Sequence, residues 1–168
     1  MRLLDFLRRK EPDREPQNAE LLAALKIENM APSPATRANL LRVLSRSTVC
    51  VAVRELPPEL SGEGPFVLQD DVRFTPLTST NRQGQTVALV FSDHQHVQAR
   101  KSGAASIEMT VQQAARNALL NGKEGMIINP AGDWVELTRE EVEHLAQTQS
   151  PGRERTIAYA TTHLRRIH

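Results

Sequence analysis

The sequence predicts an α/β protein of the α+β kind, in which an αα-hairpin precedes a single domain with a mixed β-sheet packed by helices. One observation behind this prediction is a change of period. Apolar residues at helical spacing end near residue 45, and the run from Val49 to Val53 is typical of a strand buried on both faces. The other is the later alternation of strand-like segments with helix-start signatures, which indicates helices that pack against a sheet.

The length and composition fit one folded core. The chain has 168 residues, 39% hydrophobic and 24% charged, and its net charge is +1. Because this charge gives no field to hold a nucleic-acid backbone, we expect no nucleic-acid partner. No apolar run approaches the roughly 18 residues that a membrane span needs, and the first residues lack a signal-peptide pattern. We therefore expect a cytoplasmic protein without a transmembrane segment.

Residues 1–17 are predicted to be a basic amphipathic segment followed by a linker. The sequence EPDREPQ, with two prolines and four charges, is typical of a linker. Two interpretations stay open for the part before it: a disordered or loosely docked tail, or a weak anchor for a membrane surface or a partner groove. The residues that would form this partner or membrane face are Leu3, Leu4, Phe6 and Leu7.

The αα-hairpin is predicted from two caps and two apolar stripes. Asn18 is a suitable N-cap for the first helix, and Ser33 for the second, with Pro34 at a position where a missing N–H costs nothing. Between them, Ala31-Pro32 ends the first helix. The stripe of the first helix consists of Leu21, Leu22 and Leu25, and that of the second consists of Leu40, Leu41 and Leu44.

Strands and three further helices are predicted after the hairpin. The strands are Val49–Val53, one or two short ones within 66–78, and the segment QTVALVF after the turn Asn81–Gly84. Cys50, the only cysteine, cannot form an internal disulfide and is expected to be a small core residue. The helix starts with a capping-box signature are Ser92 with Gln95, Thr110 with Gln113, and Thr138 with Glu141. The domain is expected to span 18–147, and 148–168 to be a polar and basic tail that could add a short strand or helix.

The sequence Asp-His-Gln-His at 93–96 raises the question of a metal or ligand site. Asp93, His94 and His96 supply three metal-ligating groups within four residues. In the first turn of a helix, however, the two histidines point about 200° apart, and no other close His or Cys completes a site. We therefore predict no metal and no cofactor, and we keep these three residues as candidate ligand contacts only.

The sequence GMIINPAGDWVEL contains the sharpest local feature of the chain. Two strand-like segments flank Asn129 and Pro130, and proline cannot donate a hydrogen bond to a sheet. Gly132 can supply a positive φ if the turn needs one. These residues predict a hairpin corner; the alternative is a catalytic or ligand-binding asparagine at a functional turn made by Asn129, Pro130 and Gly132.

The order of these segments resembles the N-terminal domain of the SseB family. The resemblance covers residues 18–147 and rests on the leading helix pair, the valine-rich strand, the ALVFSD strand that runs into a helix, and the Ile-Asn-Pro turn before a Thr-Arg-Glu helix start. It implies a compact α/β domain from bacteria, without known catalytic residues or cofactor. It also implies an association with serine sensitivity and, partly through a shared name, with type III secretion. The chain departs from the family in its DHQH sequence, where acidic residues are more usual, and only 21 residues follow Gln147, where family members often carry a second domain.

Two functions follow as hypotheses. The first is a non-enzymatic protein-interaction or regulatory module, because the sequence contains no Gly-x-Ser-x-Gly elbow and no glycine-rich phosphate loop. A protein partner is expected under this hypothesis. The second is a small-molecule-binding domain or weak enzyme that uses the Asn129-Pro130 turn together with His94 and His96.

Overall fold

The computed structural model describes residues 18–53, 66–67, 74–100, 105–130, 132–150 and 157–159. The predicted segment 1–17, with its apolar face, lies outside them. The helices are α2 (Ala19–Met30), α3 (Pro34–Leu44), α4 (His94–Arg100), α5 (Val111–Leu120) and α6 (Arg139–Gln147). The strands are β1 (Thr48–Val53), β2 (Phe66–Val67), β3 (Thr78–Thr80), β4 (Thr86–Phe91), β5 (Ala105–Thr110), β6 (Met126–Ile128), β7 (Val135–Leu137) and β8 (Ile157–Tyr159).

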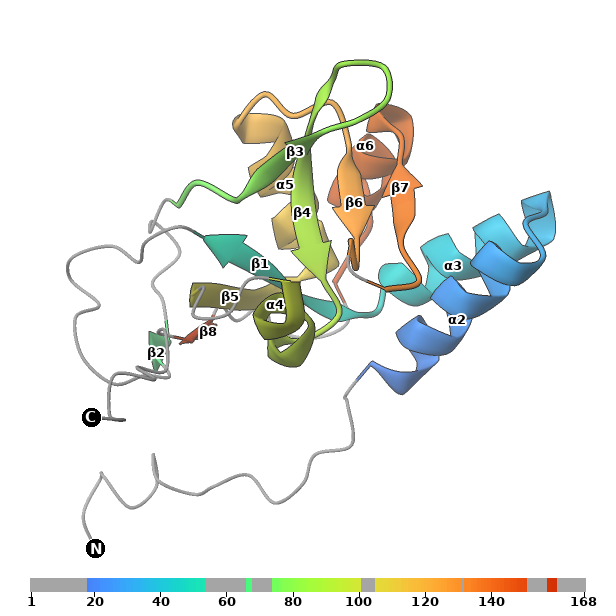
Figure 1. The fold of residues 1–168 in the computed structure, drawn as a ribbon, viewed down its shortest axis with the longest axis horizontal. Coiled ribbons are helices and arrows are strands. Elements are labelled where there is room, and N and C mark those ends of the chain that lie inside the picture. The colour runs from blue at the N-terminus through green and yellow to red at the C-terminus, as the bar shows by residue number, and fades with distance from the viewer. Residues whose placement is uncertain are drawn as a thin grey trace, which may run out of the picture.

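The described strands form one mixed sheet in the order β2-β8-β5-β1-β4-β6-β7, with β3 paired to β4. Strands β4 and β6 are parallel, whereas the other pairs are antiparallel. The α2–α3 hairpin stands to one side of this sheet (Figure 1). These features confirm the predicted α+β fold with its leading αα-hairpin. Strand β8 belongs to the segment 148–168 that was expected to be a tail.

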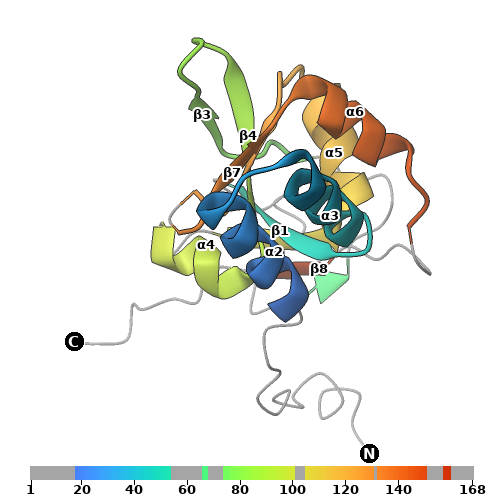
Figure 2. The ribbon, with the colours of Figure 1, turned by 90° about the vertical axis from the view of Figure 1, so that its right-hand side faces the viewer.

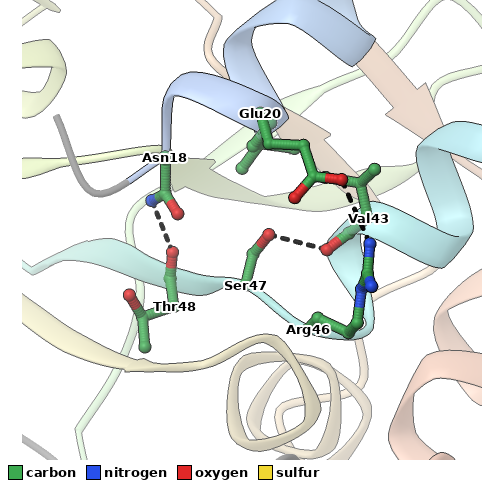
Figure 3. Close-up of a pocket in the computed structure, with 7 residues that line it drawn as sticks. Asn18, Glu20, Val43, Arg46, Ser47 and Thr48 are labelled. Carbon is green, nitrogen blue, oxygen red and sulfur yellow. Dashed lines mark hydrogen bonds and ion pairs between the residues drawn. The ribbon is translucent and has the colours of Figure 1, made fainter.

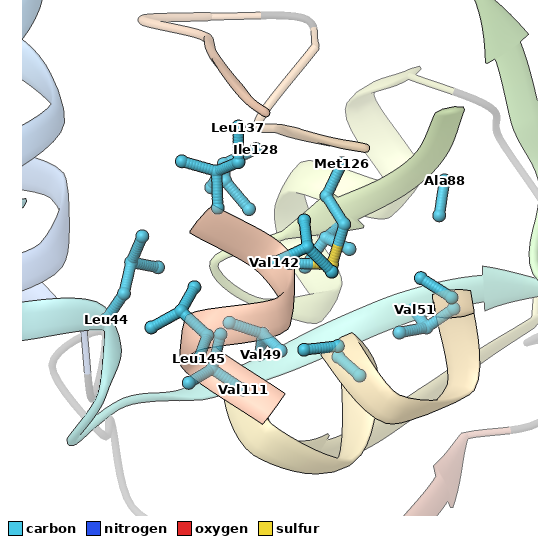
Figure 4. Packing of buried hydrophobic residues seen from close by; sticks show 14 of the residues in the cluster. Leu44, Val49, Val51, Ala88, Val111, Met126, Ile128, Leu137, Val142 and Leu145 are labelled. Carbon is cyan, nitrogen blue, oxygen red and sulfur yellow. The ribbon is translucent and has the colours of Figure 1, made fainter. Parts of the chain in front are cut away.

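The two faces of the sheet are covered unequally. Residues Val49, Val51 and Val53 of β1 face a large core that also contains buried residues of α2, α3, α5 and α6. Figure 4 shows side chains of α3, α5 and α6 and of β4, β6 and β7 converging there. On the other face, Val97 of α4 packs on a small cluster that includes Cys50 and Phe91. Figure 2 shows α4 on one side of strands β4 and β7, and α5 and α6 on the other.

Strand β1 is buried on both faces, as its sequence predicts. All six of its residues pair with β5 on one side, Cys50 and Val51 pair with β4 on the other, and five of the six are buried. Cys50 is a free, buried thiol on the face of the small cluster, so its expected place in the core is confirmed. Burial raises the pKa of this thiol, and the neighbouring charge of Glu108 raises the pKa further. A thiol of this kind is unreactive.

Strand β5 was not predicted, and it lies next to β1 near the middle of the sheet. The predicted element order placed a helix after residue 92 and another after Thr110, with no strand between them. The alternation of Ala105, Ile107 and Met109 with Ser106 and Glu108 is the period of two that a strand requires. The first three face the large core, so this alternation was the available signal.

The predicted apolar stripes of the helix pair need a small correction. The buried residues of α2 are Leu21, Ala24 and Leu25, and those of α3 are Leu40, Val43 and Leu44. Leu22 and Leu41, which belonged to the predicted stripes, are only half-buried. In both helices the buried set follows the spacing i, i+3, i+4, which places three residues on one face.

Helices α2 and α4 begin where the sequence predicts; three of the five predicted N-caps are confirmed, and the capping roles of Ser92 and Asn18 are wrong. Ser33, Thr110 and Thr138 each accept the N3 backbone N–H in a reciprocal capping box. Ser92 does not cap α4: the carboxylate of Asp93 accepts the N–H of His96 at 2.9 Å instead. Asn18 precedes α2, but its side chain makes no cap hydrogen bond. Both side chains are used in contacts between distant segments, which a local signature cannot reveal.

Arg37 ties the αα-hairpin to the rest of the domain. Its guanidinium donates from Nε and Nη2 to the two carboxylate oxygens of Glu141 on α6, both at 2.7 Å. Nη2 also donates to the backbone oxygen of Glu136 at 2.6 Å, and Glu28 of α2 lies 3.6 Å from Nη1. Burial alone would raise the pKa of Glu141, but the hydrogen bonds from Arg37 and Thr138 and the charge of Arg37 together outweigh burial, and the pKa is lowered. The paired side chains are only 25% and 19% exposed, so solvent screens this contact weakly.

We expect Glu141→Gln to lower the free energy of unfolding by about 1 to 2 kcal/mol at neutral pH, because it removes the charged partner of Arg37. Glutamine retains the capping box with Thr138. Since the folded-state pKa of Glu141 is depressed, the carboxylate stabilises the fold above its unfolded pKa of 4.5, and this stabilisation is lost as the pH falls through the folded value. Urea unfolding over a pH series should therefore show the variant and the wild type converging in acid.

The matched control is Glu143→Gln on the same helix. Glu143 pairs with Arg139 at 3.0 Å, but these side chains are 46% and 52% exposed. Exposed pairs contribute little, so this variant should unfold like the wild type. Equal effects of the two substitutions would contradict the role assigned to Arg37.

Candidate functional site

A cluster of polar side chains lies at one edge of the sheet, where the parallel strands β4 and β6 both end. Asn129 follows β6, is 2% exposed and has a φ of 53°, so the chain turns there in the left-handed region. Its backbone N–H donates to the oxygen of Val90 at 2.8 Å. Its side-chain Oδ1 accepts the N–H of Ser92 at 2.7 Å, and its Nδ2 donates to Ser92 Oγ at 3.0 Å. The asparagine therefore joins the two strand ends through buried hydrogen bonds.

The next members of this edge cluster are Asp93 and His96. Ser92 Oγ donates to Asp93 at 2.9 Å and lies 3.3 Å from His96 Nδ1. Asp93 holds the same Nδ1 atom at 2.8 Å. A catalytic relay needs the carboxylate and the hydroxyl on different ring nitrogens. Here both lie on one nitrogen and the serine proton goes to the carboxylate, so the geometry is that of a helix cap.

Asp93 carries a negative charge in the edge cluster, and its neighbours stabilise that charge. Burial alone would raise the pKa of this carboxyl, but the hydrogen bonds from the ring and backbone of His96, and from Ser92, outweigh burial and lower the pKa. The carboxylate form is therefore stabilised by its own helix. An anionic cap at the start of α4 also suits the positive end of the helix dipole.

Asn18 connects the edge cluster to the helix pair. Its Nδ2 donates to the backbone oxygen of Thr48 at 2.7 Å and also to the backbone oxygen of Ser92. Asn18 is 7% exposed. The start of α2, the start of β1 and the end of β4 are thus held by one amide group.

The two histidines of the predicted site point to different places. His94 Nδ1 lies 2.5 Å from Ser106 Oγ on β5, whereas His96 turns back to Asp93. Burial lowers the pKa of His94, while the charge of Asp93 opposes this shift. Within the described parts of the chain, no three His, Cys, Asp or Glu residues are grouped as a metal site would require.

The Asn129-Pro130 turn is the hairpin corner that the sequence predicts, with one difference. Strands β6 and β7 pair antiparallel across it, and the Gly132 N–H donates to the Asn129 oxygen at 3.1 Å. The positive φ falls on Asn129 and not on Gly132. Asparagine tolerates this conformation better than most residues, because its short polar side chain can bond locally. A ligand role for Asn129, Pro130 or Gly132 stays a prediction.

A hollow of about 350 Å³ lies between α2, α3 and β1. It was not predicted, because its residues come from three elements. Figure 3 shows Asn18 bonded to Thr48 on one side and the carboxylate of Glu20 facing Arg46 on the other, where they pair at 3.1 Å. The lining residues are Asn18, Glu20, Leu21, Val43, Arg46, Ser47 and Thr48.

A second feature of α2 is an exposed apolar row on the side opposite the core. Ile27 is 49% and Met30 is 74% exposed, and Ala19 and Ala23 are exposed as well. At about 100° per residue, these four side chains fall within an arc of about 80°. We call them the outer stripe of α2. Their spacing of i, i+4, i+8 and i+11 is visible in the sequence. The prediction gave this helix a single apolar face, that of Leu21, Leu22 and Leu25, and so missed the second one.

The comparisons with known proteins give one match. The family model described as the SseB protein N-terminal domain matches residues 19–144, which is more than half of the chain. Neither a curated protein nor a solved structure matches. Among the described helices, none is both long and apolar enough to cross a membrane.

We expect Asn129→Ala to lower the free energy of unfolding by about 3 kcal/mol, because it removes two buried hydrogen bonds and places a Cβ-bearing residue without a local bond in the left-handed region. Asn129→Gly loses the same hydrogen bonds but accepts the backbone conformation, so it should cost about 1 kcal/mol less. Urea unfolding of both variants checks this order. If glycine proved more destabilising than alanine, the positive φ would not be a constraint in solution.

Proposed function

The chain belongs to the SseB family, whose N-terminal domain it carries, and from this premise we propose that it is a non-enzymatic protein-interaction or regulatory module. The polar side chains of the edge cluster support the proposal, because they form hydrogen bonds with one another. Ser92 is 2% exposed, and its hydroxyl bonds to Asp93 and Asn129. A buried hydroxyl with this set of partners has no path to a substrate.

The observation that carries the proposal is the outer stripe of α2. Large apolar side chains in water are unfavourable at about 25 cal/mol per Å² of apolar surface, and contiguous exposed groups often mark contact surfaces. Ile27 and Met30 lie one helical turn apart on one side of a helix whose opposite side is fixed in the core. The contact is therefore a rigid helix face of modest size, which suits a transient protein partner.

The proposal places this module in the cytoplasm. Its single cysteine, Cys50, is a free thiol in the core, which suits a reducing compartment. The family association with serine sensitivity is compatible with a regulatory partner.

A second candidate function is the binding of a small molecule in the hollow between α2, α3 and β1. Its volume of about 350 Å³ falls in the range of ligand pockets. The backbone and side-chain groups of Thr48 and Arg46 give it polar contacts beside the apolar Leu21 and Val43 (Figure 3). This location replaces the Asn129-Pro130 turn as the place where we would look for a ligand, because the amide of Asn129 is bonded to Ser92.

We expect the double variant Ile27→Glu, Met30→Glu to lose at least tenfold of the specific partner recovered with the tagged full chain from a lysate of its native cells, since two charges would oppose burial of the stripe. Quantitative crosslinking and mass spectrometry measure the recovery. Leu120→Glu is the matched control, because Leu120 is 87% exposed at the end of another helix. Unchanged recovery with the stripe variant, or no specific partner at all, would contradict the proposal.

The second candidate makes a separate prediction for a thermal-shift screen of free amino acids, serine included. A ligand at 100 times its Kd should add about 2.7 kcal/mol to the free energy of unfolding. Arg46→Gln should abolish that shift while leaving the unliganded protein folded, because the Arg46 side chain is 51% exposed. A shift that persists in this variant would place the ligand elsewhere, and the absence of any shift would remove this candidate.

A further inference from the structure

We propose that the exposed face of the α2–α3 pair binds an amphipathic helix of a partner protein, one that carries acidic residues beside its apolar side. This inference rests on the proposed function, since it names the class of partner that the outer stripe of α2 takes. The binding face consists of that stripe together with Ala35, Ala38 and Arg42 of α3, and we call it the α2–α3 face.

Helix α3 supplies the second half of the α2–α3 face. Ala35, Ala38 and Arg42 are exposed and, at about 100° per residue, they fall within an arc of about 60°. The buried residues of α3 lie on the opposite side of this helix. The two helices lie side by side (Figure 1, Figure 2), and Arg42 Nη2 lies 4.0 Å from the carboxylate of Glu20 on α2. The exposed sides of the two helices therefore adjoin.

Small side chains leave room for a third helix against α2 and α3. Four of the six apolar positions of the α2–α3 face are alanines, and the other two are Ile27 and Met30. The distance at which two helices pack depends on the side chains between them, so alanines allow a close approach. Ile27 and Met30 then serve as the larger anchors, as in other cases where an amphipathic helix lies against a helical surface.

The charges beside the α2–α3 face favour an acidic partner. Lys26 is exposed on one side of the stripe, whereas Arg42 and Arg46 lie on the other side. Both arginines approach the same oxygen of Glu20, at 4.0 and 3.1 Å, and one carboxylate cannot neutralise two guanidinium groups. The whole segment 18–47 contains four Lys or Arg residues and only two Glu residues. Acidic residues beside the apolar side of a docking helix complement this charge.

The same features argue against a second copy of the chain or a membrane as the occupant. In a symmetric dimer the same surface meets itself, so the cations of the α2–α3 face would be brought together with cations. Helices that bind a membrane surface carry Trp, Phe and Leu on their apolar side. The α2–α3 face has none of these residues, and most of its apolar positions are alanines. A helix of another protein is therefore the occupant that fits.

The test measures how two labelled synthetic peptides bind to the full chain, by fluorescence anisotropy. Both peptides are helices of about 18 residues, or five turns, with the same apolar side of leucine and alanine. Glutamates flank the apolar side in one peptide, and lysines flank it in the other. At low salt the acidic peptide should bind about tenfold more tightly than the basic one. This ratio should shrink as the salt concentration rises, because the charges are exposed.

Reversing the charge of the α2–α3 face should reverse the preference between the peptides. The double variant Arg42→Glu, Arg46→Glu should bind the basic peptide more tightly than the acidic one. The matched control is Arg82→Glu, Arg100→Glu, which changes the net charge equally at exposed positions in the β3–β4 turn and in α4. This control should keep the preference for the acidic peptide.

The apolar anchors give a further check. Ile27→Glu, Met30→Glu should weaken binding of the acidic peptide about tenfold, because charges then replace the side chains that the peptide buries. Equal affinity for the two peptides, binding of neither, or a reversal by the control variant as well would overturn the proposal. Binding to vesicles of phosphatidylcholine and phosphatidylglycerol, or self-association, would also overturn it if this variant abolished that binding. Lipid or a second copy would then be the occupant.

Failure of this inference is distinguishable from failure of the proposed function. A lysate partner that is lost with Ile27→Glu, Met30→Glu but fully retained with Arg42→Glu, Arg46→Glu would leave the proposed function intact. It would overturn the acidic helix as the class of partner. The absence of any lysate partner would instead count against the proposed function, while the peptide measurement would still decide which charge the α2–α3 face prefers.

Discussion

Ser92 is the point on which the arrangement of the domain depends. Its backbone N–H and hydroxyl are held by the amide of Asn129, and its backbone oxygen accepts a hydrogen bond from Asn18. Three segments far apart in the sequence therefore meet at the end of β4. Burying polar groups of this kind costs free energy unless each has a hydrogen-bond partner. Only one arrangement of the three segments satisfies them all, whereas apolar packing alone would allow several. Among the described residues, no buried side-chain nitrogen or oxygen lacks a partner.

The placement of α2 follows from this junction and from Arg37. Asn18 fixes the start of the helix against β1 and β4, and Arg37 of α3 connects Glu28 of α2 with Glu141 of α6. The helix is thus held at Asn18, directly before its first residue, and near its last turn. With Leu21, Ala24 and Leu25 in the core, rotation about the helix axis is also fixed. The outer stripe then faces away from the core as a consequence of these contacts.

The sequence was sufficient to predict the features that depend on neighbouring residues. Period and capping residues located β1, β4, α5 and α6, because apolar spacing and hydroxyl caps act within a few positions. It was insufficient where a side chain serves a distant segment. Asn18 and Ser92 look like caps, but one bonds to Thr48 and Ser92, and the other to Asn129. The hollow beside Arg46 was beyond prediction for the same reason, since α2, α3 and β1 form it together.

The surroundings of Asn129 share features with active sites, and hydrogen bonding within the fold accounts for each of them. A left-handed φ, deep burial and a serine, an aspartate and a histidine nearby are features of many active sites. In this protein each of those groups completes the hydrogen bonding of another, and the strain of one turn is offset by the bonds that join β4 to β6. Among the residues that the structure describes, the outer stripe of α2 is instead a group of apolar side chains that stays exposed. This contrast between satisfied polar groups and exposed apolar ones is what supports the proposed contact with another protein surface.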